Sequence, residues 1–330
     1  MGIYPGFSTE AMSEIWSAES RVAAMVDFEA AVAVAQAEVG DIPRDAATAI
    51  MLATSDSVPE TVLAEGWSAG TPVLPLLDVL KSRLDSDSAP HLHHALTTQD
   101  VVDTATMVMA RDATAALRDL GEACWTALRS ATDRFGSVAT EARSFLQAAE
   151  TTTFAARFAR WSAPLDTLGR VQVAFPVQLG GLTGERKGIS DGVVELVAQA
   201  LDLDPAPRSW HTDRTPVLDI VTHALRYAQW AEKVAGDIAI LGALGEVKTR
   251  AGGSSAAAGK QNPIDAMRAM AAAESCSGVA SIILLAKPHE LERGLGSWHA
   301  EWFALPLVFM TAGAAMEAVR DSLESLEVVS

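Results

Sequence analysis

The stretch 217–247 reads VLDIVTHALRYAQWAEKVAGDIAILGALGEV and carries the clearest indication of the fold. Its apolar residues recur at spacings of three and four, the period of an amphipathic helix, and little of the chain shows the alternation of a strand. At 3.6 residues per turn the pattern continues for about eight turns. The segments 99–120 and 153–168 repeat it over shorter lengths. Because such unbroken length is typical of bundles, we predict an all-α fold built on long helices.

Proline and glycine are sparse, and we expect turns where they cluster. A boundary near Pro90 would separate a small helical N-terminal domain, residues 1–90, from a central long-helix bundle domain, residues 91–330. The clusters lie at 70–72, 88–90, 180–181, 204–207 and 252–253.

The composition is that of an acidic globular protein. The chain has 25 basic and 42 acidic residues, a formal net charge of −17, and 49% hydrophobic residues. An acidic surface repels phosphate backbones, so we expect no nucleic-acid partner. The hydrophobic content excludes disorder and is sufficient for a sizeable core.

Cysteine usage and the amino terminus both bear on the compartment. Cys124 and Cys276 lack CxxC spacing, so we expect neither a disulfide framework nor a zinc cluster, which fits a reducing cytosol. The first 16 residues lack the basic and apolar parts of a signal peptide, and no apolar run approaches the roughly 18–20 residues of a membrane span. We therefore expect a cytoplasmic protein without a membrane partner.

Segment 249–263, TRAGGSSAAAGKQNP, interrupts the helical pattern. A flexible Gly/Ser linker is one interpretation. A Walker phosphate loop is disfavoured, since Ser254 stands where its first glycine belongs and Gln261 replaces its Ser/Thr. The third interpretation is a catalytic loop, in which Ser254 exchanges a proton beside an anion site made by Lys260 and a helix amino terminus. Between positions 247 and 273 there are four basic residues and one acidic residue, in contrast to the acidic whole.

The second cluster, 91–104, begins with three histidines in four positions. Metal binding is disfavoured, because the histidines lack helical i, i+4 spacing and accompanying carboxylates. Thr97 and Thr98 precede a helix expected to start near Gln99, and they are consistent with an N-cap. The same hydroxyls and the free N–H groups of a helix start can also bind a carboxylate.

The third cluster, 290–302, combines two tryptophans, a histidine and an arginine around two glycines. It is consistent with the wall of a pocket. It is equally consistent with a buried aromatic corner in which Arg293 pairs with Glu290 or Glu301.

Together the clusters resemble the fumarase/aspartase superfamily, whose signature loop reads roughly Gly-Ser-Ser-x-Met-Pro-x-Lys-x-Asn-Pro. Residues 253–263, GSSAAAGKQNP, align with it without a gap. Within the superfamily the chain resembles the family of 3-carboxy-cis,cis-muconate cycloisomerases. This likeness lies in HHALTTQDVVDT at 93–104, WHTDR at 210–214, and ERGLGSWHAEW at 292–302 followed by Leu305-Pro306.

The resemblance implies a role for each matching residue. Ser254 would transfer the proton, and Lys260 and Asn262, with Ser255, would bind a substrate carboxylate. Thr97 and Thr98 would hold another carboxylate, to which Arg293 adds charge. Gln147 and His211 are further substrate-binding candidates. Phe145 occupies the position of the histidine found in adenylosuccinate lyases, and cycloisomerases carry a large apolar residue there.

The resemblance also implies a small polycarboxylate substrate, no metal or organic cofactor, and a homotetramer whose active sites are shared between subunits. The expected reaction is lactonisation, in which a carboxylate adds across its own conjugated double bond. The additional carboxy-terminal domain of many members is not expected, since the chain ends at Ser330.

Two alternatives stay open. Asp213, where the family has glutamine, is compatible with an elimination lyase that releases fumarate from a substituted succinate. Ala257-Ala258, where the family has Met-Pro, would loosen the loop and is compatible with a non-catalytic paralogue.

Overall fold

The computed structural model describes residues 4–253, 261–285 and 289–329. The described residues contain eleven α-helices, one 3-10 turn and four short strands. The helices are α1 (Glu10–Ile15), α2 (Ala18–Val39), α3 (Arg44–Ser55), α4 (Thr61–Ala69), α5 (Val73–Lys81), α6 (Thr98–Phe135), α7 (Phe154–Arg170), α8 (Asp191–Ala200), α9 (Thr215–Ala243), α10 (Ile264–Leu284) and α11 (Ser297–Glu324). The strands are β1 (Ala139–Ser144), β2 (Gln147–Thr153), β3 (Val247–Lys248) and β4 (Glu327–Val328).

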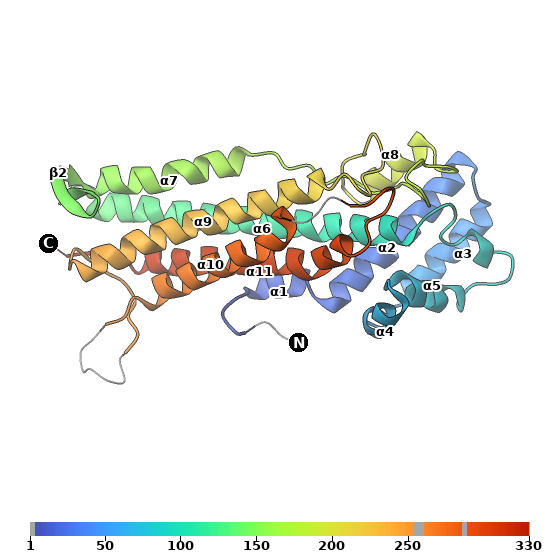
Figure 1. Ribbon diagram of the computed structural model, residues 1–330, viewed down its shortest axis with the longest axis horizontal. Helices are drawn as coiled ribbons and strands as arrows, with labels where there is room; N and C mark the ends of the chain where they lie inside the picture. Colours follow the sequence, from blue (N-terminus) through green and yellow to red (C-terminus); the bar gives the residue numbers. More distant parts are fainter. Residues whose placement is uncertain (1–3, 254–260, 286–288, 330) are drawn as a thin grey trace.

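Long helices form an elongated bundle, and the shorter helices gather at one end of it. Figure 1 shows α6, α7, α9, α10 and α11 running along the molecule, with α2 to α5 and α8 at the right-hand end. The helices predicted over 99–120, 153–168 and 217–247 are α6, α7 and α9. The predicted all-α bundle is therefore confirmed. The domain boundary near residue 90 stays a prediction.

Local signals set the helix ends. Thr97 is the N-cap of α6, and Pro216 stands in the first turn of α9, where its missing N–H costs no hydrogen bond. Helix α9 ends at Ala243, four residues before the predicted end, because Gly245 turns the chain with a φ of 76° into β3. Helix α10 starts directly after Asn262-Pro263, as expected.

Two antiparallel strand pairs were not predicted: the hairpin β1–β2, and the pair β3–β4, whose strands are separated in the chain by α10 and α11. Strand β1 pairs with β2, and β3 pairs with β4. The β1–β2 turn places Phe145 and Leu146 at positive φ, 50° and 64°. Such a turn normally carries glycine or asparagine, so this sequence lacks the usual hairpin signal.

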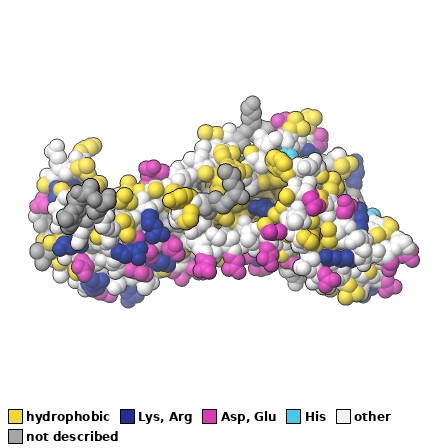
Figure 2. Space-filling model, turned by 90° about the horizontal axis from the view of Figure 1, so that it is seen from below, with side chains coloured by type: hydrophobic (Ala, Val, Ile, Leu, Met, Phe, Trp, Pro, Cys, Tyr) yellow, Lys and Arg dark blue, Asp and Glu magenta, His cyan; other side chains and the backbone are white. Residues whose placement is uncertain are grey.

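Helix α11 lies in the core of the bundle. By length and composition it could cross a membrane, but 67% of its most apolar window is buried inside the protein. The core helix of a soluble bundle has this character. Figure 2 shows acidic side chains along the lower edge of one face and a group of Lys and Arg side chains at its left end.

Candidate active site

The amino terminus of α6 holds the first predicted site residues. The side chain of Arg293 donates a hydrogen bond from Nη1 to Thr97 Oγ1 over 2.6 Å. Thr97 is buried and Thr98 is partly exposed at the first position of the helix. Free N–H groups, two hydroxyls and a guanidinium therefore meet at one place. This combination suits a carboxylate, because the helix dipole and the charge-assisted bonds both favour an anion.

The buried Asp100 carboxylate holds the start of helix α6 in place. It is fully buried, and its Oδ2 accepts from the backbone N–H of Thr97 over 3.0 Å. Its further donors are the backbone N–H groups of Gly180 and Gly181 at 2.8 and 3.0 Å, and His211 Nε2 at 2.9 Å. A carboxylate surrounded by donors to this degree is a rigid anchor.

The Gly180-Gly181 turn reaches Asp100 only because it lacks side chains. A Cβ at Gly180 would stand 2.4 Å from Ser209 Oγ and 2.7 Å from His211 Cε1. Gly181 also has a positive φ of 65°, which glycine adopts without strain. The turn predicted here is present, and it delivers two backbone donors to the anchor.

His211 lies behind the candidate site. Its side chain is 3% exposed, and Nε2 is occupied by Asp100. Nδ1 has no hydrogen-bond partner among the described residues. This geometry favours a supporting role through Asp100, and the predicted contact of His211 with substrate stays a prediction.

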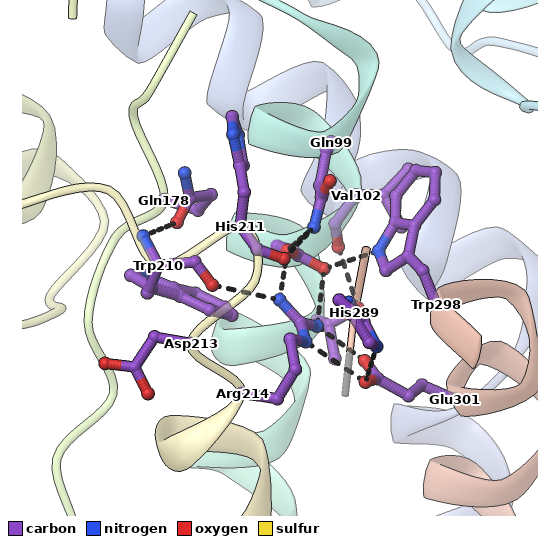
Figure 3. Close-up of polar contacts among 12 residues, drawn as sticks. Gln99, Val102, Gln178, Trp210, His211, Asp213, Arg214, His289, Trp298 and Glu301 are labelled. Carbon is purple, nitrogen blue, oxygen red and sulfur yellow. Dashed lines mark hydrogen bonds and ion pairs between the residues drawn. The ribbon is translucent and has the colours of Figure 1, made fainter. Parts of the chain in front are cut away.

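A second buried anchor joins three helices. Arg214 donates to Asp103 from Nη1 and Nη2 over 2.7 and 3.1 Å, and to Glu301 from Nε and Nη2 over 3.0 and 2.5 Å. Figure 3 shows the guanidinium between Glu301 and the side chains of α6. Burial acts to lower the pKa of Arg214, but the two carboxylates outweigh it and hold the pKa above its ordinary value. The pairs tie the amino-terminal ends of α9 and α11 to α6.

The same anchor positions the third cluster. Trp298 Nε1 donates to Asp103 Oδ1 over 2.9 Å, and the rings of Trp298 and Trp302 meet edge to face at 4.8 Å. Of the two partners considered for Arg293, Glu290 and Glu301, the second pairs with Arg214, and Arg293 donates to Thr97. Burial lowers the pKa of Arg293, while Asp100 and Asp103 act to raise it. The cluster is therefore a packed aromatic corner whose Arg293 reaches the start of α6, and its role as the wall of a pocket stays a prediction.

Other predicted residues lie far from this place within one chain. Gln147 is exposed at the start of β2, beyond the opposite end of α6, whose 38 residues span about 57 Å at 1.5 Å per residue. Asn262 follows the far end of α9 and pairs with Gly252 through backbone hydrogen bonds of 2.9 and 3.1 Å. Ser254, Ser255 and Lys260 lie outside the described residues.

Asp213, where the family has glutamine, and the exposed Leu291 are not directed at the site. The Asp213 carboxylate accepts from Thr215 Oγ1 over 2.6 Å and from Arg208, and it is turned away from Arg214 in Figure 3. The Thr215 hydroxyl lowers the pKa of Asp213. Leu291 is exposed at a positive φ of 45°. The Asp213 carboxylate thus bonds to Thr215, the first residue of α9.

Comparison with known proteins decides the family. The model of the lyase family matches residues 6–274. The chain belongs to this lyase family. The 3-carboxy-cis,cis-muconate cycloisomerase of Acinetobacter baylyi is 31% identical over 96% of this chain and 75% of its own length. Nitrosuccinate lyase of Streptomyces davaonensis is 32% identical over 93% of this chain and 70% of its own.

Solved structures agree with this assignment. The β-carboxy-cis,cis-muconate cycloisomerase of Acinetobacter calcoaceticus superposes with a TM-score of 0.88 at 30% identity, covering 98% of this chain and 77% of that one. A fumarate lyase from Mesorhizobium superposes with a TM-score of 0.89 at 29% identity, covering 99% of this chain and 78% of that one. The predicted superfamily resemblance is confirmed, and this lyase-family chain is an enzyme of the isomerase or lyase type.

The sequence did not predict the two buried anchors, which are centred on Asp100 and Asp103. Asp100 and Asp103 stand one helical turn apart on α6, a spacing that places them on one face. Their partners Gly180, His211 and Arg214 follow about 80 to 110 positions later, and no local pattern links them. Among the described residues, no group of three or more His, Cys, Asp or Glu side chains could hold a metal ion.

Proposed function

We propose that this lyase-family enzyme converts 3-carboxy-cis,cis-muconate, or a close analogue, into a muconolactone in the cytoplasm. One substrate carboxylate adds across the conjugated double bond, and Ser254 delivers a proton to the adjacent carbon. Lys260 and Asn262 stabilise the enolate-like carboxylate, and Thr97, Thr98 and Arg293 hold another carboxylate. No metal or organic cofactor takes part in this proposal.

The observation that carries the proposal is the bond from Arg293 to Thr97 at the amino terminus of α6. It brings together two segments 196 positions apart, which supports the proposal that they bind one carboxylate. Both segments belong to motifs through which the chain resembles cycloisomerases. Phe145, in place of a general-acid histidine, also favours lactonisation over the chemistry of adenylosuccinate lyases.

We further propose that each active site is shared between subunits of a homotetramer. The Thr97 end of α6 and the hairpin that carries Gln147 are about 57 Å apart along the helix. A small polycarboxylate cannot bridge that length. Chains packed in opposite directions would instead bring the Thr97 end of one chain to the hairpin and the 249–263 segment of others.

An ultraviolet assay of lactonisation tests the reaction. Wild-type protein should consume 3-carboxy-cis,cis-muconate, and Ser254→Ala should lose at least 1,000-fold in kcat while retaining substrate binding. Ser190→Ala, at the N-cap of α8, is the matched control for a serine outside the site. Absence of lactonisation in the wild type, or an unchanged rate in Ser254→Ala, would contradict the proposal.

Elimination is the second candidate, because fumarate lyase and nitrosuccinate lyase are similar to this chain to the same degree as the cycloisomerases. The Asp213 carboxylate, which motivated this alternative, accepts hydrogen bonds from Thr215 at the start of α9. Fumarate release from nitrosuccinate or another substituted succinate, without lactonisation, would favour elimination. A protein inactive in both assays would favour the non-catalytic alternative.

A further inference from the structure

Arg293 lies in a turn, residues 289–296, that leads into α11. Inside this turn the backbone N–H of Arg293 donates to the oxygen of Glu290 over 3.1 Å, and the N–H of Leu295 donates to the Glu290 carboxylate over 2.9 Å. These bonds fix the shape of the turn. Its place against α6, on which the contact between Arg293 and Thr97 depends, needs a contact outside the turn.

His289 is the buried residue of this turn. Its side chain is 1% exposed, whereas Leu291 and Leu295 are 89% and 76% exposed. A polar ring inside the protein, in a turn whose leucines face solvent, reverses the usual distribution of side chains. General packing therefore does not account for His289.

One side of the His289 ring supports the turn. A Cβ at Gly294 would stand 2.7 Å from His289 Nδ1 and 2.8 Å from Cγ, so the imidazole lies directly against the backbone of the residue that follows Arg293. Gly294 allows this approach because it has no side chain. The orientation of the ring therefore limits where the backbone beside Arg293 can lie.

The other side of the ring faces the buried anchor. His289 Nε2 lies 3.4 Å from Glu301 Oε1, and Figure 3 shows His289 and Arg214 both directed at the Glu301 carboxylate. This carboxylate can only accept, so we assign the proton of a neutral ring to Nε2. Because Asp103 and Glu301 share one guanidinium, an additional N–H beside Glu301 is favourable.

These contacts attach the turn to α6 a second time. Glu301 is bound through Arg214 to Asp103, which stands about 9 Å along α6 from Thr97 at 1.5 Å per residue. The turn is thus held to one helix by Arg293 at Thr97 and by His289 through Glu301. The second attachment needs no partner chain, since its members come from one chain and their side chains are at most 9% exposed.

We propose that His289 is a positioning residue for Arg293, and that its contact with Glu301 sets how well the site binds a substrate carboxylate. The inference rests on the role that the proposed function gives to Arg293. A group that only orients a binding residue acts on the ground state and the transition state alike, so its loss raises KM and leaves kcat nearly unchanged. His289 itself does not touch the substrate.

Steady-state lactonisation by three variants tests this role. His289→Leu keeps an apolar side chain of similar size without the N–H, and it should raise KM about ten-fold, because misplacing a binding group is costly. His289→Gln keeps a donor for Glu301 and should recover most of the loss. His91→Leu, in the 3-10 turn Ala89–His91, is the matched control and should leave KM unchanged.

A double variant separates positioning from a general effect on the fold. If His289 acts through Arg293, adding His289→Leu to Arg293→Gln should change KM by less than about two-fold. A histidine with only a structural role would weaken both backgrounds equally. Equal effects in the two backgrounds, or an unchanged KM in His289→Leu itself, would overturn the proposal.

Two further readouts do not depend on lactonisation. In calorimetric titration with tricarballylate, a tricarboxylate that cannot lactonise, wild type and His289→Gln should bind more tightly than His289→Leu. In the free protein, backbone hydrogen exchange across 289–296 should be faster in His289→Leu than in wild type. A wild type that binds tricarballylate in this order without lactonising would refute the proposed reaction and leave the role of His289 intact. Unchanged exchange in His289→Leu would exclude that role whatever the reaction.

Discussion

Replacing Arg214 with methionine should be among the most destabilising single changes in the bundle. Methionine occupies a similar length but leaves Asp103 and Glu301 without their cation. Those carboxylates are 4% and 8% exposed, so water cannot replace the lost partner. Removing one member of a buried ion pair typically costs about 3–5 kcal/mol. We expect a loss in this range, and the second carboxylate favours its upper part.

Urea unfolding of wild-type and variant protein, at equal concentration, measures this loss. Arg208→Met is the matched control, because its pair with Asp213 is largely exposed and worth about 0–1 kcal/mol. The unpaired carboxylates in Arg214→Met should have raised pKa values in the folded state. Their protonation as pH falls should therefore recover part of the loss, making the variant relatively less destabilised at pH 5 than at pH 8. A loss below about 1 kcal/mol, equal to that of Arg208→Met, would refute the role assigned to this anchor.

Three further predictions concern single residues. Burial, with Arg118 and Arg226 nearby, lowers the pKa of His223 to about 4, so the unfolded chain takes up the proton first. Stability should fall by about 3 kcal/mol from pH 7 to pH 4 through this group, and His223→Leu should abolish that part of the slope in urea unfolding. Arg293→Gln should lower kcat/KM for the substrate by about 10- to 150-fold, because a hydrogen bond to a charged group contributes about 1.5–3 kcal/mol. Arg293→Lys should recover part of this loss. An unchanged kcat/KM in Arg293→Gln would exclude contact with the substrate. Gly180→Ala should cost about 1–3 kcal/mol through its clash with Ser209, whereas Gly236→Ala, with open space around it, should not destabilise; equal melting temperatures for the two would contradict the close approach.

The long helices could be predicted because their information is local. Each apolar stripe of α6, α7 and α9 repeats every three or four residues, and burial follows the stripe. The N-cap at Thr97 and the start of α10 after Pro263 are equally local. The β1–β2 hairpin could not be predicted in this way. Its strands are exposed and polar, and Phe145-Leu146 is an unusual turn sequence.

The candidate site could be predicted only where a motif marked it. Thr97 and Arg293 come from such motifs, and the structure joins them. The anchor of Asp103, Arg214 and Glu301 depends on pairings 87 and 111 positions apart, which periodicity does not report. The bond of the Asp213 carboxylate to Thr215 at the start of α9 is local, and it was not predicted from the sequence.

The length of α6 has a consequence for how such chains can vary. One uninterrupted helix of 38 residues connects the Thr97 end to the hairpin end. Deleting a single residue from its middle would move one end by about 1.5 Å and turn it by about 100° relative to the other. Hairpins and surface loops can gain or lose residues without that penalty. We therefore expect insertions and deletions among functional relatives to avoid the interior of α6, so that this helix keeps a constant residue count while its connections change.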